Sequence, residues 1–205
     1  MPEDTRSFAM ETNCDVTPYH SQGSDRNGSS RIRESPSSSK SQGYNEAVRP
    51  TVYIETTIPS YYHDDRKDLA NDIQRTRQWW DHERQSYECF ISAVVVDELA
   101  AGNYPNQSRC LDLVSNIPIL AITPEVIHIA EAYQATGFMP KAPVRDALHV
   151  AIASHYRMDF LLTWNCRHLA NVHKSRHLEV LNVRMGLAVP RLVTPHLLQP
   201  LEEIP

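Results

Sequence analysis

The feature that most constrains the fold of this chain is a regular alternation of short β-rich runs and longer helical stretches, which begins at Arg49. The β-rich runs are TVYIE at 51–55, CFIS at 89–92, IPILAIT at 117–123, DFLLTW at 159–164 and RLV at 191–193. Such alternation is typical of a parallel sheet covered by helices on both faces, with right-handed crossovers between strands. The sequence therefore predicts an α/β fold with a central, mostly parallel sheet of about five strands.

The stretches between these runs have helical periodicity. The predicted helices cover 64–88, 93–101, 105–116, 124–136, 144–156 and 178–185. Ser92 and Thr123 are expected N-caps, Pro124 suits the first helical position, and Gly186 is expected to end the last helix. The segment TIPSYYHDD at 57–65 contains a proline and several polar residues, and we interpret it as a loop that leaves the first strand.

Residues 1–48 differ from the rest of the chain in composition. They include ten serines with scattered glycine, asparagine and charged residues, and hardly any large aliphatic side chains. Such a segment cannot bury enough apolar surface to offset the conformational entropy lost on folding. We therefore expect a disordered, Ser-rich N-terminal arm at 1–48 and one folded domain at 49–205.

The formal net charge of −5 argues against a protein coated in basic residues for indiscriminate nucleic-acid binding. The charge is unevenly distributed, because residues 141–191 contain eight Lys/Arg and only three Asp/Glu. This stretch would bind a phosphate backbone if its charges share one face. An ordinary solvated surface is the alternative, and the sequence leaves both interpretations open.

The four cysteines are far apart and form no CxxC pair, which argues against a disulfide framework and favours a reducing cytoplasm. No uninterrupted apolar run reaches the roughly 18 residues that a membrane span needs. The N-terminus also lacks the apolar stretch of a secretory signal. We expect a cytoplasmic protein that does not enter a membrane.

Three carboxylates and one amide fall near one edge of the predicted sheet. Glu55 ends the first strand, Glu98 lies about one turn into the helix after the second strand, Asp146 is near the start of the helix before the fourth strand, and Asn165 follows that strand. Clustered carboxylates repel one another unless a cation neutralises them. Oxygen-rich sites of this kind select hard divalent ions, so Mg2+ or Mn2+ is expected there.

Three sequence stretches carry a resemblance to a known family. They are VYIETTIPSYY at 52–62, ISAVVVDELAAG at 91–102 and RDALHVAIASHYRMDFLLTWNCRHLAN at 145–171. In order and spacing, from about Thr51 to the C-terminus, the chain resembles the PIN domain of VapC-like toxins of type II toxin–antitoxin systems. The resemblance implies a PIN-like α/β/α sandwich at 49–205 that hydrolyses phosphodiester bonds of RNA with Mg2+ or Mn2+. It also implies an antitoxin partner and a homodimer.

The resemblance assigns residues to the site. The first three acids of the family match Glu55, Glu98 and Asp146, which are the implied metal ligands, and the fourth position, usually Asp, matches Asn165. Glu55 stands where Asp is usual, which lengthens the ligand arm by one methylene, and Asn165 removes a charge that would support a second ion. Two hypotheses follow: an active endoribonuclease toxin, or a catalytically weakened PIN-fold module that binds RNA or protein.

The implied chemistry is attack of a metal-polarised water on the phosphorus, with the ion offsetting the developing charge. Thr56, Thr57 and Thr163 are candidate substrate-binding hydroxyls, although such groups can equally satisfy backbone atoms at strand ends. Arg145 and Arg167 flank the acids in sequence and are candidate phosphate contacts. The same carboxylates would also suit a phosphatase or a DNA nuclease.

Other side chains offer alternative sites. Cys166 with His168, His173 and His177 invites a zinc site, although their spacing fits no compact Cys/His pattern. His149 follows Asp146 by one helical turn and could face the site, but we interpret it as a hydrogen-bonded core histidine. Trp164 is expected to pack in the core, and the pair at 79–80 could stack on bases or form a partner-binding surface.

Overall fold

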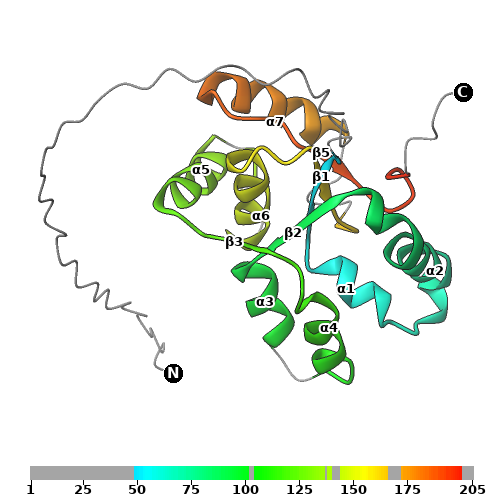
Figure 1. Cartoon of the computed structure of the whole chain (residues 1–205). Coiled ribbons are helices and arrows are strands. Elements are labelled where there is room, and N and C mark those ends of the chain that lie inside the picture. Colours follow the sequence, from blue (N-terminus) through cyan, green and yellow to red (C-terminus); the bar gives the residue numbers. More distant parts are fainter. Residues whose placement is uncertain (1–48, 102–103, 137, 140–143, 166–171, 200–205) are drawn as a thin grey trace, which may run out of the picture. The chain divides into compact units, whose positions relative to one another are not determined.

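Five short parallel strands form the central sheet of the described structure (Figure 1). The computed structural model describes residues 49–101, 104–136, 138–139, 144–165 and 172–199, all of which lie within one unit, Glu46–Pro205. The strand order is β3-β2-β1-β4-β5, and every pairing is parallel. The strands are β1 (Thr51–Ile54), β2 (Glu88–Ser92), β3 (Ile119–Leu120), β4 (Phe160–Leu162) and β5 (Arg191–Val193). The predicted α/β fold with a five-stranded sheet is confirmed.

Strand β1 lies at the centre of the sheet and is buried on both faces, with Val52, Tyr53 and Ile54 fully shielded from solvent. Tyr53 is level with Phe90 of β2 and with Leu161 of β4. The register continues one residue past β1, where Glu55 N donates to the Leu162 carbonyl at 3.0 Å. Glu55 is therefore fixed by the backbone at the carboxyl edge of the sheet.

Helices cover both faces of the sheet, as the PIN-like α/β/α sandwich predicts. Right-handed crossovers place the connections between β1, β2 and β3 on one face and those from β3 to β4 and β5 on the other. Figure 1 shows α5, α6 and α7 on one side of the strands and α1, α2 and α4 on the other. The helices are α1 (Thr57–Tyr62), α2 (Ala70–Gln78), α3 (Ala93–Ala100), α4 (Gln107–Val114), α5 (Pro124–Ala135), α6 (Val144–His155) and α7 (Val172–Met185).

The segment after β1 begins with the helix α1, so the prediction of a loop at 57–65 is wrong for its first six residues. Pro59 does not prevent the helix, because it lies in the first turn, where backbone N–H groups have no partner within the helix. Ile58 and Pro59 are buried and anchor the helix against the core. The turn directly beyond Glu55 is therefore packed against the core and carries Thr56 and Thr57 beside the sheet edge.

The predicted helix ends are mostly confirmed. Thr123 caps α5 by accepting from Val126 N at 3.4 Å, and Pro124 is the first residue of that helix. Ser92 precedes α3 as predicted, but its side chain makes no capping bond and instead bonds the Tyr53 hydroxyl. Helix α7 begins at Val172, earlier than predicted, and ends directly before Gly186.

The stretch predicted as one helix over 64–88 is divided. A single turn at Lys67–Leu69 leads into α2, which continues as a π-helical turn at Trp79–Glu83 and a 3-10 turn at Arg84–Ser86. Trp79 and Trp80 are 0% and 7% exposed, so the proposed base-stacking or partner-binding surface at this pair is wrong. Both indoles belong to the hydrophobic core.

Several sequence-based predictions fall outside the described residues. These are the N-terminal arm at 1–48, Arg167 among the phosphate contacts, and, among the zinc candidates, Cys166, His168 and the side chain of His173. Within the described part of the chain, none of the helices has the length and apolar character needed to cross a membrane.

Candidate functional site

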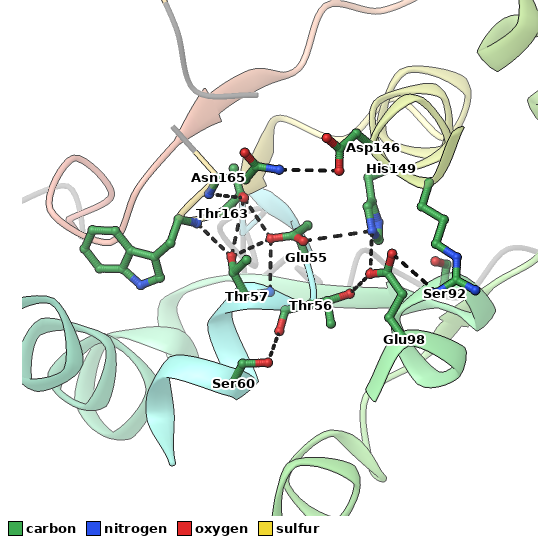
Figure 2. Close-up of polar contacts among 12 residues, drawn as sticks. Glu55, Thr56, Thr57, Ser60, Ser92, Glu98, Asp146, His149, Thr163 and Asn165 are labelled. Atoms are coloured by element: carbon green, nitrogen blue, oxygen red, sulfur yellow. Dashed lines mark hydrogen bonds and ion pairs between the residues drawn. The ribbon is translucent and has the colours of Figure 1, made fainter. Parts of the chain in front are cut away.

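Glu55 is the most deeply placed acid of the site, with only 4% of its surface exposed. Its Oε2 accepts hydrogen bonds from the Thr57 backbone N–H at 3.1 Å, the Thr57 hydroxyl at 2.5 Å and the Thr163 hydroxyl at 2.7 Å. These donors come from α1 and from the residue after β4, and they orient the carboxylate (Figure 2). A buried carboxylate needs such donors, because burial without hydrogen bonds is strongly unfavourable.

Glu98 reaches the same point from α3. Its Oε2 accepts from the Thr56 hydroxyl in a short hydrogen bond and from His149 Nε2 at 3.1 Å. Its Oε1 lies 4.0 Å from an Arg145 guanidinium nitrogen. Burial favours a raised pKa for Glu98, but the hydrogen bonds from His149 and Thr56 and the nearby charge of Arg145 outweigh it, so the pKa is lowered. Glu98 is therefore an ionised carboxylate at neutral pH.

A buried histidine joins the two acids. His149, on α6, is 1% exposed, and its Nε2 lies 3.1 Å from Glu98 and 4.0 Å from Glu55 Oε1. One ligand atom from each of Glu55, Glu98 and His149 lies within 4.8 Å of the others, and in the described residues this is the one group of three acidic, histidine or cysteine side chains so arranged.

The other nitrogen of His149 is held by Tyr53. His149 Nδ1 lies 2.8 Å from the Tyr53 hydroxyl, which in turn lies 2.7 Å from the Ser92 hydroxyl. Burial raises the pKa of Tyr53 far above that of a free phenol, so its hydroxyl keeps its proton. Because the Glu98 carboxylate only accepts, His149 Nε2 is the donor in its contact with Glu98.

Asp146 and Asn165 lie above Glu55 in Figure 2, whereas Glu98 lies below and to the right of it. Asn165 Nδ2 donates to Asp146 Oδ1 at 3.4 Å, and the Asn165 backbone N–H donates to the Thr163 hydroxyl at 2.9 Å. Asp146 is 9% exposed and is not a member of the group formed by Glu55, Glu98 and His149. The fold thus gathers all four predicted site residues at one edge, with Asp146 outside the group of Glu55, Glu98 and His149.

The three predicted substrate-binding hydroxyls all point at the acids. Thr56 binds Glu98, and Thr57 and Thr163 bind Glu55. Two of these hydroxyls also accept from backbone N–H groups, Thr57 from Trp164 at 2.8 Å and Thr163 from Asn165. The threonines therefore orient the carboxylates and satisfy the backbone together, and their contact with a substrate stays a prediction.

The donor set fits a hard divalent cation. Glu55 and Glu98 each use Oε2 for hydrogen bonds, whereas Oε1 of Glu55 lies 4.0 Å from His149 Nε2 and Oε1 of Glu98 lies 4.0 Å from Arg145. Asp146, also buried, adds a third carboxylate one helical turn before His149 on α6. Oxygen donors with partial burial are the ligands that Mg2+ and Mn2+ select.

His149 is the site residue that sequence reasoning underestimated. It is a hydrogen-bonded core histidine, as predicted, and it also contacts both central acids. The one available indication was its spacing, three residues after Asp146 on the same helix face. Trp164, expected in the core, is partly buried and stacks on Tyr61 with ring centroids 5.5 Å apart.

Comparison of the sequence with protein-family models and with curated proteins gives no match. Solved structures do match. A chain of a toxin–antitoxin complex from Klebsiella pneumoniae is 19% identical with a TM-score of 0.47, and the match covers 70% of this chain and 97% of that chain. A chain of VapBC2 from Rickettsia felis, bound to a DNA fragment from its promoter, is 12% identical with a TM-score of 0.43, over 70% of this chain and 98% of the other.

Proposed function

We propose that this chain is a Mg2+- or Mn2+-dependent endoribonuclease of the PIN type, controlled as a toxin by an antitoxin protein. The observation that carries the proposal is the convergence of Glu55 and Glu98 on His149, within 4.8 Å, at the carboxyl edge of a parallel sheet. Ligands of open parallel sheets bind at this edge. The choice of RNA as substrate and of an antitoxin as partner derives from the sequence resemblance described above.

Glu55, Glu98 and Asp146 are the residues that would hold the ion. When bound, a divalent ion there supplies a Lewis acid for the phosphate and lowers the pKa of a coordinated water. The chain prepares the ligands in advance, because hydroxyl donors on Glu55 and Glu98 fix both carboxylates before any ion arrives. A preorganised ligand set avoids the reorganisation that would otherwise oppose binding.

Arg145 is the phosphate contact that the geometry favours. Its side chain is 53% exposed, and its guanidinium lies 4.0 Å from Glu98 Oε1, at the mouth of the site. A guanidinium at that position can donate two hydrogen bonds to a phosphate while staying close to the carboxylates. We expect it to orient the scissile phosphate and to offset charge that develops on its oxygens.

The test uses purified full-length chain, a structured RNA and a DNA of the same sequence, each with Mn2+ and with EDTA. We expect the wild type to cleave the RNA only when Mn2+ is present, and we expect Asp146→Asn and Glu98→Gln to lose this cleavage. Asp97→Asn is the matched control, because Asp97 is an exposed carboxylate adjacent to Glu98 on the same helix. A second readout is thermal stability, since an ion that binds the folded chain raises Tm in the wild type and in Asp97→Asn.

The outcomes separate the candidate activities. Metal-dependent cleavage retained in both site variants would contradict the proposed ligands. DNA cleaved as readily as RNA would replace the ribonuclease with a general phosphodiesterase. A Tm rise with Mn2+ but no cleavage of either polymer would leave an ion-binding module without this chemistry.

A second candidate function is a PIN-fold module with weakened catalysis that binds RNA or protein. The observation that favours it is the contact of Asn165 with Asp146, in which an amide donates to the acid where the family usually has a fourth carboxylate. Replacing Asn165 with Asp supplies the missing charge. Under this alternative, Asn165→Asp creates metal-dependent cleavage that the wild type lacks.

A further inference from the structure

A second polar region lies at the amino end of the sheet, opposite the carboxylates. A cavity of about 550 Å3 opens there among residues that precede or begin β1, β4 and β5. Its lining includes the arginines Arg49, Arg157 and Arg191 and one acid, Asp159. The length of β1, four residues, separates the two ends of the sheet by about 13 Å.

A neighbouring cavity of about 540 Å3 shares Val189 and Arg191 with the first and adds Arg176 and Glu179. The connected pair therefore presents four arginines and two acids. We name it the arginine cavity, defined by Arg49, Arg157, Arg176 and Arg191. Three of these arginines come from the basic stretch at 141–191, so part of that stretch does share a face, whereas Arg145 lies at the other edge of the sheet.

The arginine cavity has a net positive charge, because four arginines line it with only two acids. One oxygen of Asp159 is occupied by the Thr51 backbone N–H and hydroxyl, both at 2.8 Å. Arg49 donates to the Gln85 carbonyl at 3.2 Å. Among the described residues, no ion pair or side-chain hydrogen bond involves the exposed guanidinium groups of Arg157, Arg176 and Arg191. Such groups are available to an anionic ligand.

The backbone of Arg157 gives an independent indication. Arg157 follows α6 with φ of +56°, a left-handed conformation that glycine adopts more readily than any other residue. Its N–H bonds the Ser154 carbonyl, and the next N–H, of Met158, bonds the Ala153 carbonyl, which is a Schellman C-cap.

The same cap ends α7, where Gly186 has φ of +68° and the N–H groups of Gly186 and Leu187 bond the carbonyls of Val183 and Asn182. The chain thus uses glycine at one Schellman cap and an unfavourable arginine at the other. An unfavourable backbone conformation at a charged, exposed residue is a reason to look for a ligand of its side chain.

We propose that the arginine cavity binds backbone phosphates of RNA, at a site separate from the carboxylates. The choice of RNA rests on the proposed function. The volume of each cavity lies in the range of small-molecule pockets, and the two are contiguous, so the pair suits an extended polyanion better than a single inorganic ion. Guanidinium groups are well matched to phosphate, because they donate paired hydrogen bonds in its geometry.

The test measures binding of a fluorescein-labelled oligouridylate to the full chain by anisotropy, in EDTA so that no cleavage occurs, over a range of salt concentrations. The variants are Arg157→Gly, Arg191→Gln and the pair of them. Arg109→Gln is the matched control, because Arg109 is an exposed arginine on α4 whose side chain donates to Asn106. Expected is a loss of about tenfold in affinity for the double variant, and a log–log salt slope shallower by about 0.7 for each arginine removed.

Arg157→Gly has a further expected effect. It relieves the left-handed backbone, so its Tm is expected to rise by roughly 2–4 °C while its RNA affinity falls. Loss of binding in this variant could not then be ascribed to unfolding. Unchanged RNA affinity and salt slope in both single variants and the double variant would overturn the proposal.

Two competitors complete the test. Inorganic phosphate that displaces the RNA at an equal phosphate concentration would overturn the polyanion in favour of a small anion. If polyglutamate displaces the labelled RNA more effectively than unlabelled oligouridylate does, RNA is not the ligand of the arginine cavity, and an acidic protein segment is favoured instead. The binding assay contains no metal and is therefore independent of catalysis. Failure of the nuclease proposal would show as absent cleavage in the Mn2+ assay with normal RNA binding, whereas failure of this inference would show as normal RNA binding in the arginine variants.

Discussion

The Tyr53 hydroxyl lies 2.8 Å from Nδ1 of His149, and through that imidazole the central strand is connected to Glu98. Tyr53 comes from β1, His149 from α6 and Glu98 from α3, so one line of hydrogen bonds joins the sheet to two helices. Figure 2 shows the contact between His149 and Glu98. The site is therefore supported by a buried polar network. Networks of this kind stabilise a fold when complete and destabilise it when one member is lost.

The first prediction concerns the phenol. Tyr53→Phe removes a hydroxyl that contacts both Ser92 and His149 in a fully buried position. The free energy of unfolding is expected to fall by about 1–3 kcal/mol, because two buried polar groups lose a partner. Urea denaturation measures it. Ser92→Ala should lower the free energy of unfolding by less in the Tyr53→Phe background than in the wild type. Strict additivity of the two changes would show that no such network exists.

The second prediction concerns His149 and metal. His149 donates to Glu98 and lies close to Glu55, so its N–H stabilises the two adjacent carboxylates when no ion is bound. His149→Ala is expected to lower Tm in EDTA by more than it does in Mn2+, because a bound cation replaces the lost stabilisation. Thermal melts of both proteins in both buffers measure the difference. If the Mn2+-induced rise in Tm disappears in His149→Ala, the imidazole is itself a ligand.

Much of the site could be predicted from the sequence, because its placement depends on strand ends. A short β-rich run that ends in Glu55, and a helix that carries Glu98 directly after the next strand, place both acids at one edge of any parallel sheet. The order of strands and helices is sufficient to predict that the two acids share an edge, without knowledge of side-chain packing.

The remainder depends on tertiary contacts that local patterns do not encode. The helical phase of His149 relative to Asp146 is visible in the sequence, but its role is decided by Tyr53, 96 residues away. Pro59 looks like a helix breaker until the helix is known to begin two residues earlier. Arg157 and Arg191 meet at one cavity because β4 and β5 are adjacent, which composition alone cannot show.

The third prediction concerns acid. The pKa of Glu98 is lowered below its ordinary value near 4.5, because His149, Thr56 and Arg145 outweigh the effect of burial. A carboxyl with a lower pKa in the folded state adds stability that is complete above pH 4.5 and is lost as the pH falls through the folded-state pKa. Glu98→Gln should therefore lose less stability than the wild type over this acid range, as measured by urea denaturation. Asp97→Asn should behave like the wild type, and equal acid sensitivity of Glu98→Gln and the wild type would contradict the lowered pKa.

The last prediction compares the two Schellman caps. Gly186 has φ of +68°, and a Cβ added there would meet no atom within 4 Å, so Gly186→Ala tests the backbone conformation without a steric clash. It is expected to lower the free energy of unfolding by about 1 kcal/mol. Arg157→Gly makes the reverse change in the same motif at the end of α6 and is expected to raise it by a similar amount. Urea denaturation with unchanged m-values measures both. A loss of stability in Arg157→Gly would mean that the arginine is retained for its contribution to the fold, and the argument that it is kept for a ligand would then lose its support.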